Sequence, residues 1–92
     1  DILSAINSIT GICYEQLRSA SRKRDYVDAR RIYAKVAYER TNYTLTELGI
    51  IINRDHATII HLIKSCNELL LTDNQFSEVY NSTINHLKCN LI

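Results

Sequence analysis

Apolar residues recur every three or four positions along most of the chain, a spacing that places side chains on one face of an α-helix. The first such stripe lies near the N-terminus and consists of Ile2, Ile6, Ile9, Cys13 and Leu17. Glycine weakens a helix, so Gly11 is expected to interrupt this segment or to separate two short helices within about residues 2–19.

A short basic segment, Ser19–Arg24, has no apolar anchor and is predicted to be a loop. An amphipathic helix is expected next, from about Tyr26 to Arg40, with Asp25 or a neighbour at its start. The polar run Thr41–Tyr43 would end it. Its expected buried positions are Val27, Ile32, Ala34, Val36 and Ala37.

The middle of the chain has the layout of a helix-turn-helix. Thr44 and Glu47 fit a capping box that opens a short helix running to about Ile52. Asn53 and Arg54 form a tight polar turn, and Asp55 is placed to cap the following helix. The first helix would turn Leu45, Leu48 and Ile51 inward; the second would bury Ile59, Ile63, Cys66 and Leu70, with Ile60, Leu62 and Leu69 broadening the stripe.

Thr72 or Asp73 is expected to cap a last helix, whose core face would be Phe76, Val79, Tyr80, Thr83, Ile84 and Leu87. The chain has no proline and only two glycines, which favours helices over a sandwich or barrel. The prediction is therefore an all-α, compact bundle of five or six helices containing a helix-turn-helix, in one domain over residues 1–92. A chain of 92 residues is too short to enclose a large ligand pocket.

Several function classes are disfavoured by the composition. Cys13, Cys66 and Cys89 suggest neither a disulfide framework nor a zinc knuckle, and they are expected to be reduced, buried thiols. His56 and His61 would not share a helix face, so no metal is expected. No cysteine has an evident histidine partner, which predicts a protein that is not an enzyme and has no cofactor or small-molecule substrate. Without an apolar run of about 18 residues or a signal peptide, the protein is expected to be cytoplasmic and not to contact a membrane.

Charge is unevenly distributed along the chain. The net charge is only +1, but the segment from Arg18 to Lys64 holds ten basic and five acidic residues. The densest basic stretch is Arg18–Arg31. Such segregation suits phosphate binding, although a solvated helix face would look the same.

The start of the second helix in the helix-turn-helix carries small polar side chains suited to a major groove. His56 and Thr58 can hydrogen-bond base edges, the methyl group of Ala57 can pack on thymine, and His61 and Lys64 suit phosphates. Helical hairpins without a DNA role share this layout, so a protein-interaction module remains the alternative. Single-strand binding is less favoured, because Tyr33, Tyr38 and Tyr80 fit half-buried helix positions.

The residues from Arg54 to His61 resemble the Arg-Asp-His-(Ser/Thr)-Thr-(Val/Ile)-x-His signature of the C-terminal domain of the bacterial replication initiator family DnaA. Ser21–Ile32 is similar to the basic loop of that family and the helix that follows it. Thr41, Asn42, Leu45, Glu47, Leu48 and Gly49 match its next conserved stretch. The resemblance covers about residues 11–70.

The resemblance implies recognition of double-stranded DNA at an asymmetric site, the DnaA box. Base contacts would fall on Asp55, His56 and Ala57, and Arg22 (with Arg24 next) would enter the adjacent minor groove. Phosphate contacts would fall on Arg30, Thr58 and His61, with Arg54 nearby. The full set of expected DNA contacts is Arg22, Lys23, Arg24, Arg30, Arg31, Thr44, Arg54, Asp55, His56, Ala57, Thr58, His61 and Lys64.

Two local departures from the family pattern bear on the target site. The turn before Arg54 lacks the usual two glycines and is one residue shorter, and Ala57 stands where a hydroxyl is usual. No phosphate-binding Gly-Lys-(Ser/Thr) loop is present, so the chain would be either an excised domain or a free-standing relative, such as one from a phage or mobile element. The independent helices expected at both ends favour the free-standing relative. The expected role is replication initiation or its regulation, with transcriptional control at a diverged site as an alternative. Residues 72–92, outside the resemblance, are a candidate surface for a protein partner.

Overall fold

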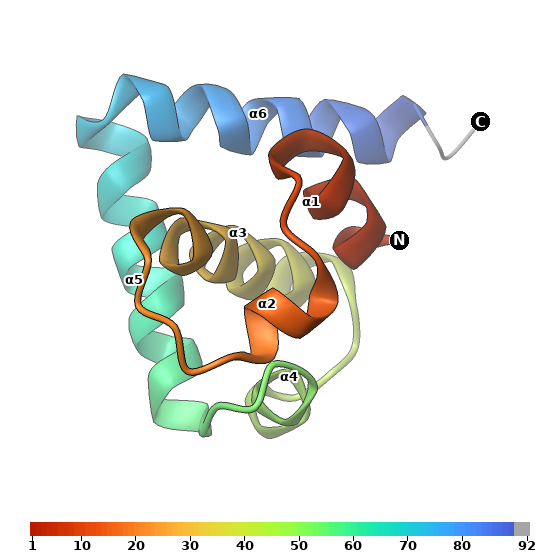
Figure 1. The fold of residues 1–92 in the computed structure, drawn as a ribbon, viewed down its shortest axis with the longest axis vertical. Helices are drawn as coiled ribbons and strands as arrows, with labels where there is room; N and C mark the ends of the chain where they lie inside the picture. Colours follow the sequence, from red (N-terminus) through yellow and green to blue (C-terminus); the bar gives the residue numbers. More distant parts are fainter. Residues whose placement is uncertain (90–92) are drawn as a thin grey trace.

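Six α-helices make up the part of the chain, residues 1–89, that the computed structural model describes (Figure 1). They are α1 (Ile2–Thr10), α2 (Tyr14–Arg18), α3 (Arg24–Arg40), α4 (Leu45–Ile51), α5 (His56–Thr72) and α6 (Asn74–Cys89). No strand occurs among these residues. The predicted all-α fold is confirmed.

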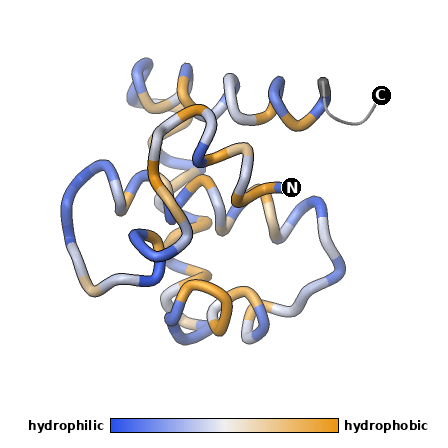
Figure 2. Tube along the Cα trace, turned by 45° about the vertical axis from the view of Figure 1, so that its right-hand side comes forward, coloured by the Kyte–Doolittle hydropathy of each residue, from blue (hydrophilic) through white to orange (hydrophobic). Residues whose placement is uncertain are grey.

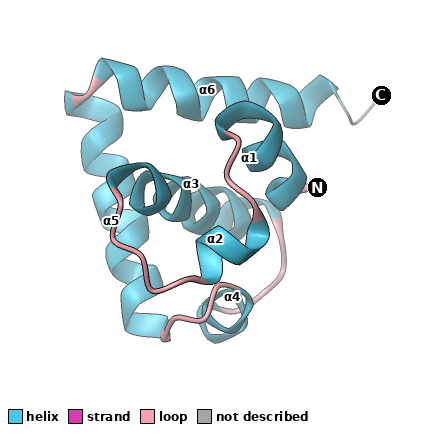
Figure 3. Cartoon of the chain, in the orientation of Figure 1, coloured by secondary structure: helices cyan, strands magenta, loops and turns pink. Residues whose placement is uncertain are grey.

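Helix α3 lies at the centre of the bundle and packs against α1, α2, α4, α5 and α6. Helix α5 runs along its side, α6 crosses one end over α1, and α4 lies at the opposite end (Figures 1 and 3). Hydrophobic stretches of the trace gather inside this arrangement, and hydrophilic ones occupy the outer bends (Figure 2). The largest fully buried side chains come from all six helices and the turn after α4, and they are Ile6, Leu17, Ile32, Val36, Leu48, Ile52, Ile59, Cys66 and Thr83.

Gly11 divides the N-terminal segment into two helices, the second of the two alternatives that the sequence left open. It adopts a left-handed conformation with φ of 77°, and its N–H donates to the carbonyl of Asn7 at 2.8 Å, which ends α1. Helix α2 then starts at Tyr14, where the side chain of Gln16 accepts from the N–H of Cys13 at 2.8 Å.

The predicted caps of the later helices are confirmed. The Thr44 hydroxyl accepts from the N–H of Glu47 at 3.1 Å, and the Glu47 carboxylate accepts from the N–H of Thr44 at 2.9 Å. Asp73, rather than Thr72, caps α6 by accepting from the N–H of Phe76 at 3.0 Å. Helix α3 begins at Arg24, a neighbour of Asp25, so Asp25 lies in its first turn.

Two side chains predicted to be at least partly buried are exposed. Ile60 has 49% of its surface accessible and Tyr38 has 50%. Each follows a buried residue, Ile59 or Ala37, and the rotation of about 100° per residue turns it away from the core. The predicted core face of α6 is confirmed, since Phe76, Tyr80 and Thr83 are buried and pack the helix onto the bundle.

The cysteine prediction is confirmed for one residue. Cys66 is fully buried between α3 and α5, and its burial raises the pKa of the thiol to about 12. Cys13 is only half-buried, and the side chain of Cys89 lies outside the described part of the structure. Among the helices that are described, none has the length and apolar character needed to cross a membrane.

Candidate nucleic-acid interface

The turn between α4 and α5 is formed by a close backbone crossing. The N–H of Arg54 donates to the carbonyl of Gly49 at 2.7 Å. A Cβ atom at Gly49 would collide with the carbonyl oxygen of Arg54 and lie 3.2 Å from its carbonyl carbon. Glycine is therefore required here so that the turn can fold back on α4.

The shortened turn closes because Asn53 adopts the left-handed conformation, with φ of 59°. Asparagine tolerates this region better than other residues with a side chain, although less well than glycine. Ile52, just before it, is fully buried and holds the end of α4 in the core. The departure from the two-glycine pattern is thus accommodated without loss of the helix-turn-helix.

The first turn of α5 presents its polar side chains to solvent. Asp55 caps the helix by accepting from the N–H of Thr58 at 2.8 Å, and this hydrogen bond lowers the pKa of the carboxyl group. His56 and Ala57 are exposed, as are His61 and Lys64 further along the helix, and Thr58 is half-buried. These exposed groups lie where the sequence predicted contacts with bases and phosphates.

Arg30 occupies a different place from the one expected for it. Only 3% of its surface is exposed, and its guanidinium donates to the carbonyls of Leu17 at 2.7 Å and Ser21 at 2.8 Å. It also donates to the carbonyls of Ser19 at 2.9 Å and Gln16 at 3.1 Å. The expected phosphate contact is therefore corrected: Arg30 points into the molecule and holds the basic loop, because those carbonyls take up its donors.

Arg54 connects the same loop to the helix-turn-helix. Its guanidinium donates to the carbonyl of Ser19 at 2.7 Å, and also to the carbonyls of Ile52 at 3.1 Å and Asn53 at 3.0 Å. The carbonyl oxygen of Ser19 thus accepts from both Arg30 and Arg54, and we call these three groups the arginine clamp. Burial and the nearby Arg54 charge lower the pKa of Arg30, an electrostatic cost that the loop carbonyls offset.

The clamp places the basic loop beside the start of α5. Ser21 and Arg22 on the loop, Asn53 and Arg54 in the turn, and Thr58 on α5 line one surface cleft. Arg22 is exposed within this arrangement. The basic loop and the first turn of α5, which are far apart in the sequence, therefore border a common surface.

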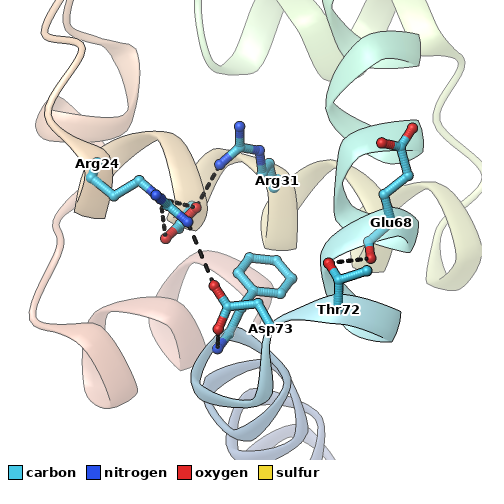
Figure 4. Close-up of polar contacts among 7 residues, drawn as sticks. Arg24, Arg31, Glu68, Thr72 and Asp73 are labelled. Carbon is cyan, nitrogen blue, oxygen red and sulfur yellow. Dashed lines mark hydrogen bonds and ion pairs between the residues drawn. The ribbon is translucent and has the colours of Figure 1, made fainter.

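Two further arginines of the basic stretch are held by carboxylates (Figure 4). Arg24 lies 3.2 Å from a carboxylate oxygen of Asp28 and 3.6 Å from one of Asp73, and Arg31 lies 2.6 Å from Asp28. The pairs with Asp28 lie within α3, and the pair between Arg24 and Asp73 joins α3 to the corner between α5 and α6. Among the described residues, Arg22 and Lys23 make no ion pair in the basic loop, although Lys23 lies 5.6 Å from the centre of the Tyr26 ring.

Sequence reasoning missed the clamp and the role of Asn53. The acceptors of the clamp are backbone carbonyls, which leave no mark in the residue types. For the turn, the sequence does contain one signal, Gly49, because a glycine shortly before a turn is typical of a close backbone approach. Thr44, expected to contact DNA, is exposed just before α4, where it is also the helix cap.

The fold and this arrangement define a small helix-turn-helix domain of the DNA-binding kind. The family described as bacterial DnaA protein helix-turn-helix matches residues 1–66. The chain belongs to this DnaA family of DNA-binding domains.

Similar curated proteins are chromosomal replication initiator proteins DnaA. That of Flavobacterium psychrophilum is 40% identical over 65 residues, which cover 70% of this chain and 14% of the relative. That of Bacteroides thetaiotaomicron is 32% identical over 83% of this chain and 16% of the relative. That of Deinococcus radiodurans is 25% identical over 96% of this chain and 19% of the relative. The chain therefore spans less than a fifth of the length of these proteins.

Proposed function

We propose that this domain binds double-stranded DNA with sequence specificity, and that it acts in replication initiation or its regulation. The start of α5 enters the major groove, and Arg22 of the basic loop enters the adjacent minor groove. The observation that carries this proposal is the hydrogen bond from Arg54 to Ser19, which keeps the loop and the helix-turn-helix on one surface. A protein that contacts two adjacent grooves of DNA needs its two DNA-binding elements, here the basic loop and α5, held in fixed positions relative to each other.

The proposed division of roles follows from exposure and chemistry. His56 and Ala57 contact base edges, and the carboxylate oxygen of Asp55 that does not cap the helix accepts from a base amino group. Arg22 reads groove width and A·T character in the minor groove. Lys23, Thr44, Thr58, His61 and Lys64 position the domain on phosphates.

Fluorescence anisotropy tests this function. The chain is titrated against a duplex containing a DnaA box and against a scrambled duplex, at two salt concentrations. We expect tighter binding to the box and weaker binding to both duplexes at higher salt. Equal affinity for the two duplexes would contradict sequence-specific recognition.

A matched pair of arginine variants tests the minor-groove assignment. Arg22→Ala should weaken binding most on A·T-rich flanks, because a narrow minor groove attracts arginine. Arg18→Ala removes the same charge from an exposed arginine of α2 that lies over the Tyr14 ring, and should have little effect. Equal losses on every flanking sequence would assign Arg22 to phosphate contact instead.

A further inference from the structure

A surface hollow of about 560 Å³ opens between the basic loop, the start of α3 and the second half of α5. Three arginines line it, namely Arg22, Arg24 and Arg31. Arg22 and Val27 line both this hollow and the cleft at the proposed DNA interface, so the hollow adjoins that interface. From their position alone, Arg24 and Arg31 would be expected to add contacts to DNA phosphates.

The carboxylate of Asp28 already takes up the donors of both arginines. Its two oxygens accept from the Nε of Arg24 at 3.2 Å and 3.3 Å, and one of them accepts from the Nη1 of Arg31 at 2.6 Å. A DNA phosphate would use the same guanidinium donors. The side chains of Asp28 and Arg31 are only 25% and 21% exposed, so solvent and salt screen this pair less than an ion pair on the open surface.

Asp73 adds a second carboxylate from another part of the fold. One of its oxygens lies 3.6 Å from the Nη2 of Arg24 (Figure 4), and the other caps α6 by accepting from the N–H of Phe76 at 3.0 Å. The cap fixes this carboxylate at the corner between α5 and α6. Arg24 therefore pairs with two carboxylates, whereas Arg22 makes no ion pair among the described residues.

We propose that the carboxylates of Asp28 and Asp73 hold the two paired arginines away from DNA phosphates, and so limit the sequence-independent part of the affinity for DNA. The inference rests on the proposed function. The carboxylates compete with phosphate for the same donors, while Arg22 stays available for the minor groove. Because phosphate contacts carry no sequence information, a domain that makes fewer of them depends more on its base contacts.

The first test measures affinity for a scrambled duplex by fluorescence anisotropy over a range of salt concentrations. Asp28→Asn keeps the shape of the side chain but removes the charge that pairs with both arginines. We expect this variant to bind on the order of tenfold more tightly at ~0.1 M salt, and the slope of log affinity against log salt to steepen by about one to two. Unchanged affinity and slope would overturn the proposal.

Two variants near α6 complete this series. Asp73→Asn keeps the helix cap, because asparagine also caps helices, and it should raise affinity by only about twofold, since Asp28 still pairs with Arg24. Glu78→Gln removes an exposed carboxylate of α6 that makes no ion pair among the described residues, and should have little effect. An equal gain in Glu78→Gln and Asp28→Asn would mean that the carboxylates act only through net charge, which would overturn the proposal.

A second test removes the arginines first. In a chain that carries both Arg24→Gln and Arg31→Gln, Asp28→Asn has no guanidinium to release and should change neither affinity nor slope. A gain as large as in the parent chain would contradict the proposed competition. The same cycle with Arg24→Gln and Asp73→Asn involves more exposed side chains, so the outcome does not depend on replacing the partly buried Arg31.

Failure of the proposed function would give a different result from failure of this inference. Equal affinity of the parent chain for a DnaA box and for the scrambled duplex would contradict sequence-specific binding, yet a gain in Asp28→Asn would still support the competition between carboxylate and phosphate. If neither the parent nor Asp28→Asn bound either duplex, both proposals would be overturned.

Discussion

At the scale of single residues, Asn53 is the one described residue other than glycine with a positive φ. Asn53→Ala should lower the free energy of unfolding by about 1 kcal/mol, because alanine lacks the local hydrogen bonding that lets asparagine adopt this region. Asn53→Gly should be neutral or mildly stabilising. Glycine relieves the backbone strain at positive φ, but it also increases the conformational entropy of the unfolded chain, which opposes folding. Urea unfolding of the two variants and the parent measures both effects. Equal destabilisation by alanine and glycine would mean that the Asn53 side chain, not its backbone conformation, stabilises the turn.

Two exposed residues of α5 should affect DNA binding in different ways. His56→Ala should relax specificity at one or two base pairs, at a cost of ~1–3 kcal/mol. Lys64→Ala should weaken binding to every duplex and reduce the slope of log affinity against log salt by about one. Selection from a randomised duplex library separates the two effects, and unchanged specificity in His56→Ala would show that α5 is not the reading element.

The side chains that could be predicted from the sequence are those whose partners lie three or four residues away. Thr44 and Asp55 cap their helices as predicted, because the N–H groups they accept from are local. Arg30 could not be placed in the same way. Its acceptors lie nine to fourteen residues earlier in the chain and are backbone carbonyls, so nothing in the residue types corrected the phosphate contact that the family resemblance implied.

At the scale of secondary-structure elements, the arginine clamp makes the basic loop and the helix-turn-helix one unit. Arg54→Lys keeps the positive charge but cannot donate to the carbonyls of Ser19, Ile52 and Asn53 in the geometry of a guanidinium. We expect affinity for a DnaA box to fall about tenfold, while affinity for a scrambled duplex changes less than about twofold. Faster hydrogen exchange at the amides of residues 19–23 should accompany this loss.

The pattern of exchange and binding distinguishes the clamp from a simple phosphate contact. If Arg54 acted only on phosphate, lysine would replace it with little change in either duplex. Arg22→Lys is the matched control, since it makes the same substitution on the loop without touching the clamp. That control should leave the exchange of residues 19–23 unchanged.

The helices and their order could be predicted, because each helix has its own stripe of regularly spaced apolar residues in the sequence. How the helices meet could not, since the packing of α6 over α1 depends on residues more than sixty positions apart. The ion pair of Arg24 with Asp73 also joins residues that are far apart in the sequence. These two residues appeared in the sequence only as part of a basic stretch and as a helix cap.

At the scale of the whole molecule, stability should depend on pH in the alkaline range through the buried thiol of Cys66. Its pKa is about 12 in the folded state against an ordinary value of 9.0, so the unfolded chain releases this proton first. The stabilising effect of a raised pKa is complete below pH 9 and is lost as pH rises from 9 towards 12. In that window each such group should lower the free energy of unfolding by up to about 1.4 kcal/mol per pH unit.

Tyr33 adds a similar loss of stability that starts at a higher pH, since burial raises its pKa from 10.0 to about 12 in the folded state. The interval from pH 9 to 10 therefore isolates Cys66. Urea unfolding in the presence of a reductant should show a smaller loss of stability across this interval in Cys66→Ala than in the parent chain, even though the variant starts less stable because it leaves a small cavity. Cys13→Ala, which removes a half-buried thiol outside the contact between α3 and α5, is the matched control and should keep the parent's dependence. Parallel curves for Cys66→Ala and the parent would mean that the thiol reaches solvent in the folded state, and that α3 and α5 separate there more readily than their buried contact implies.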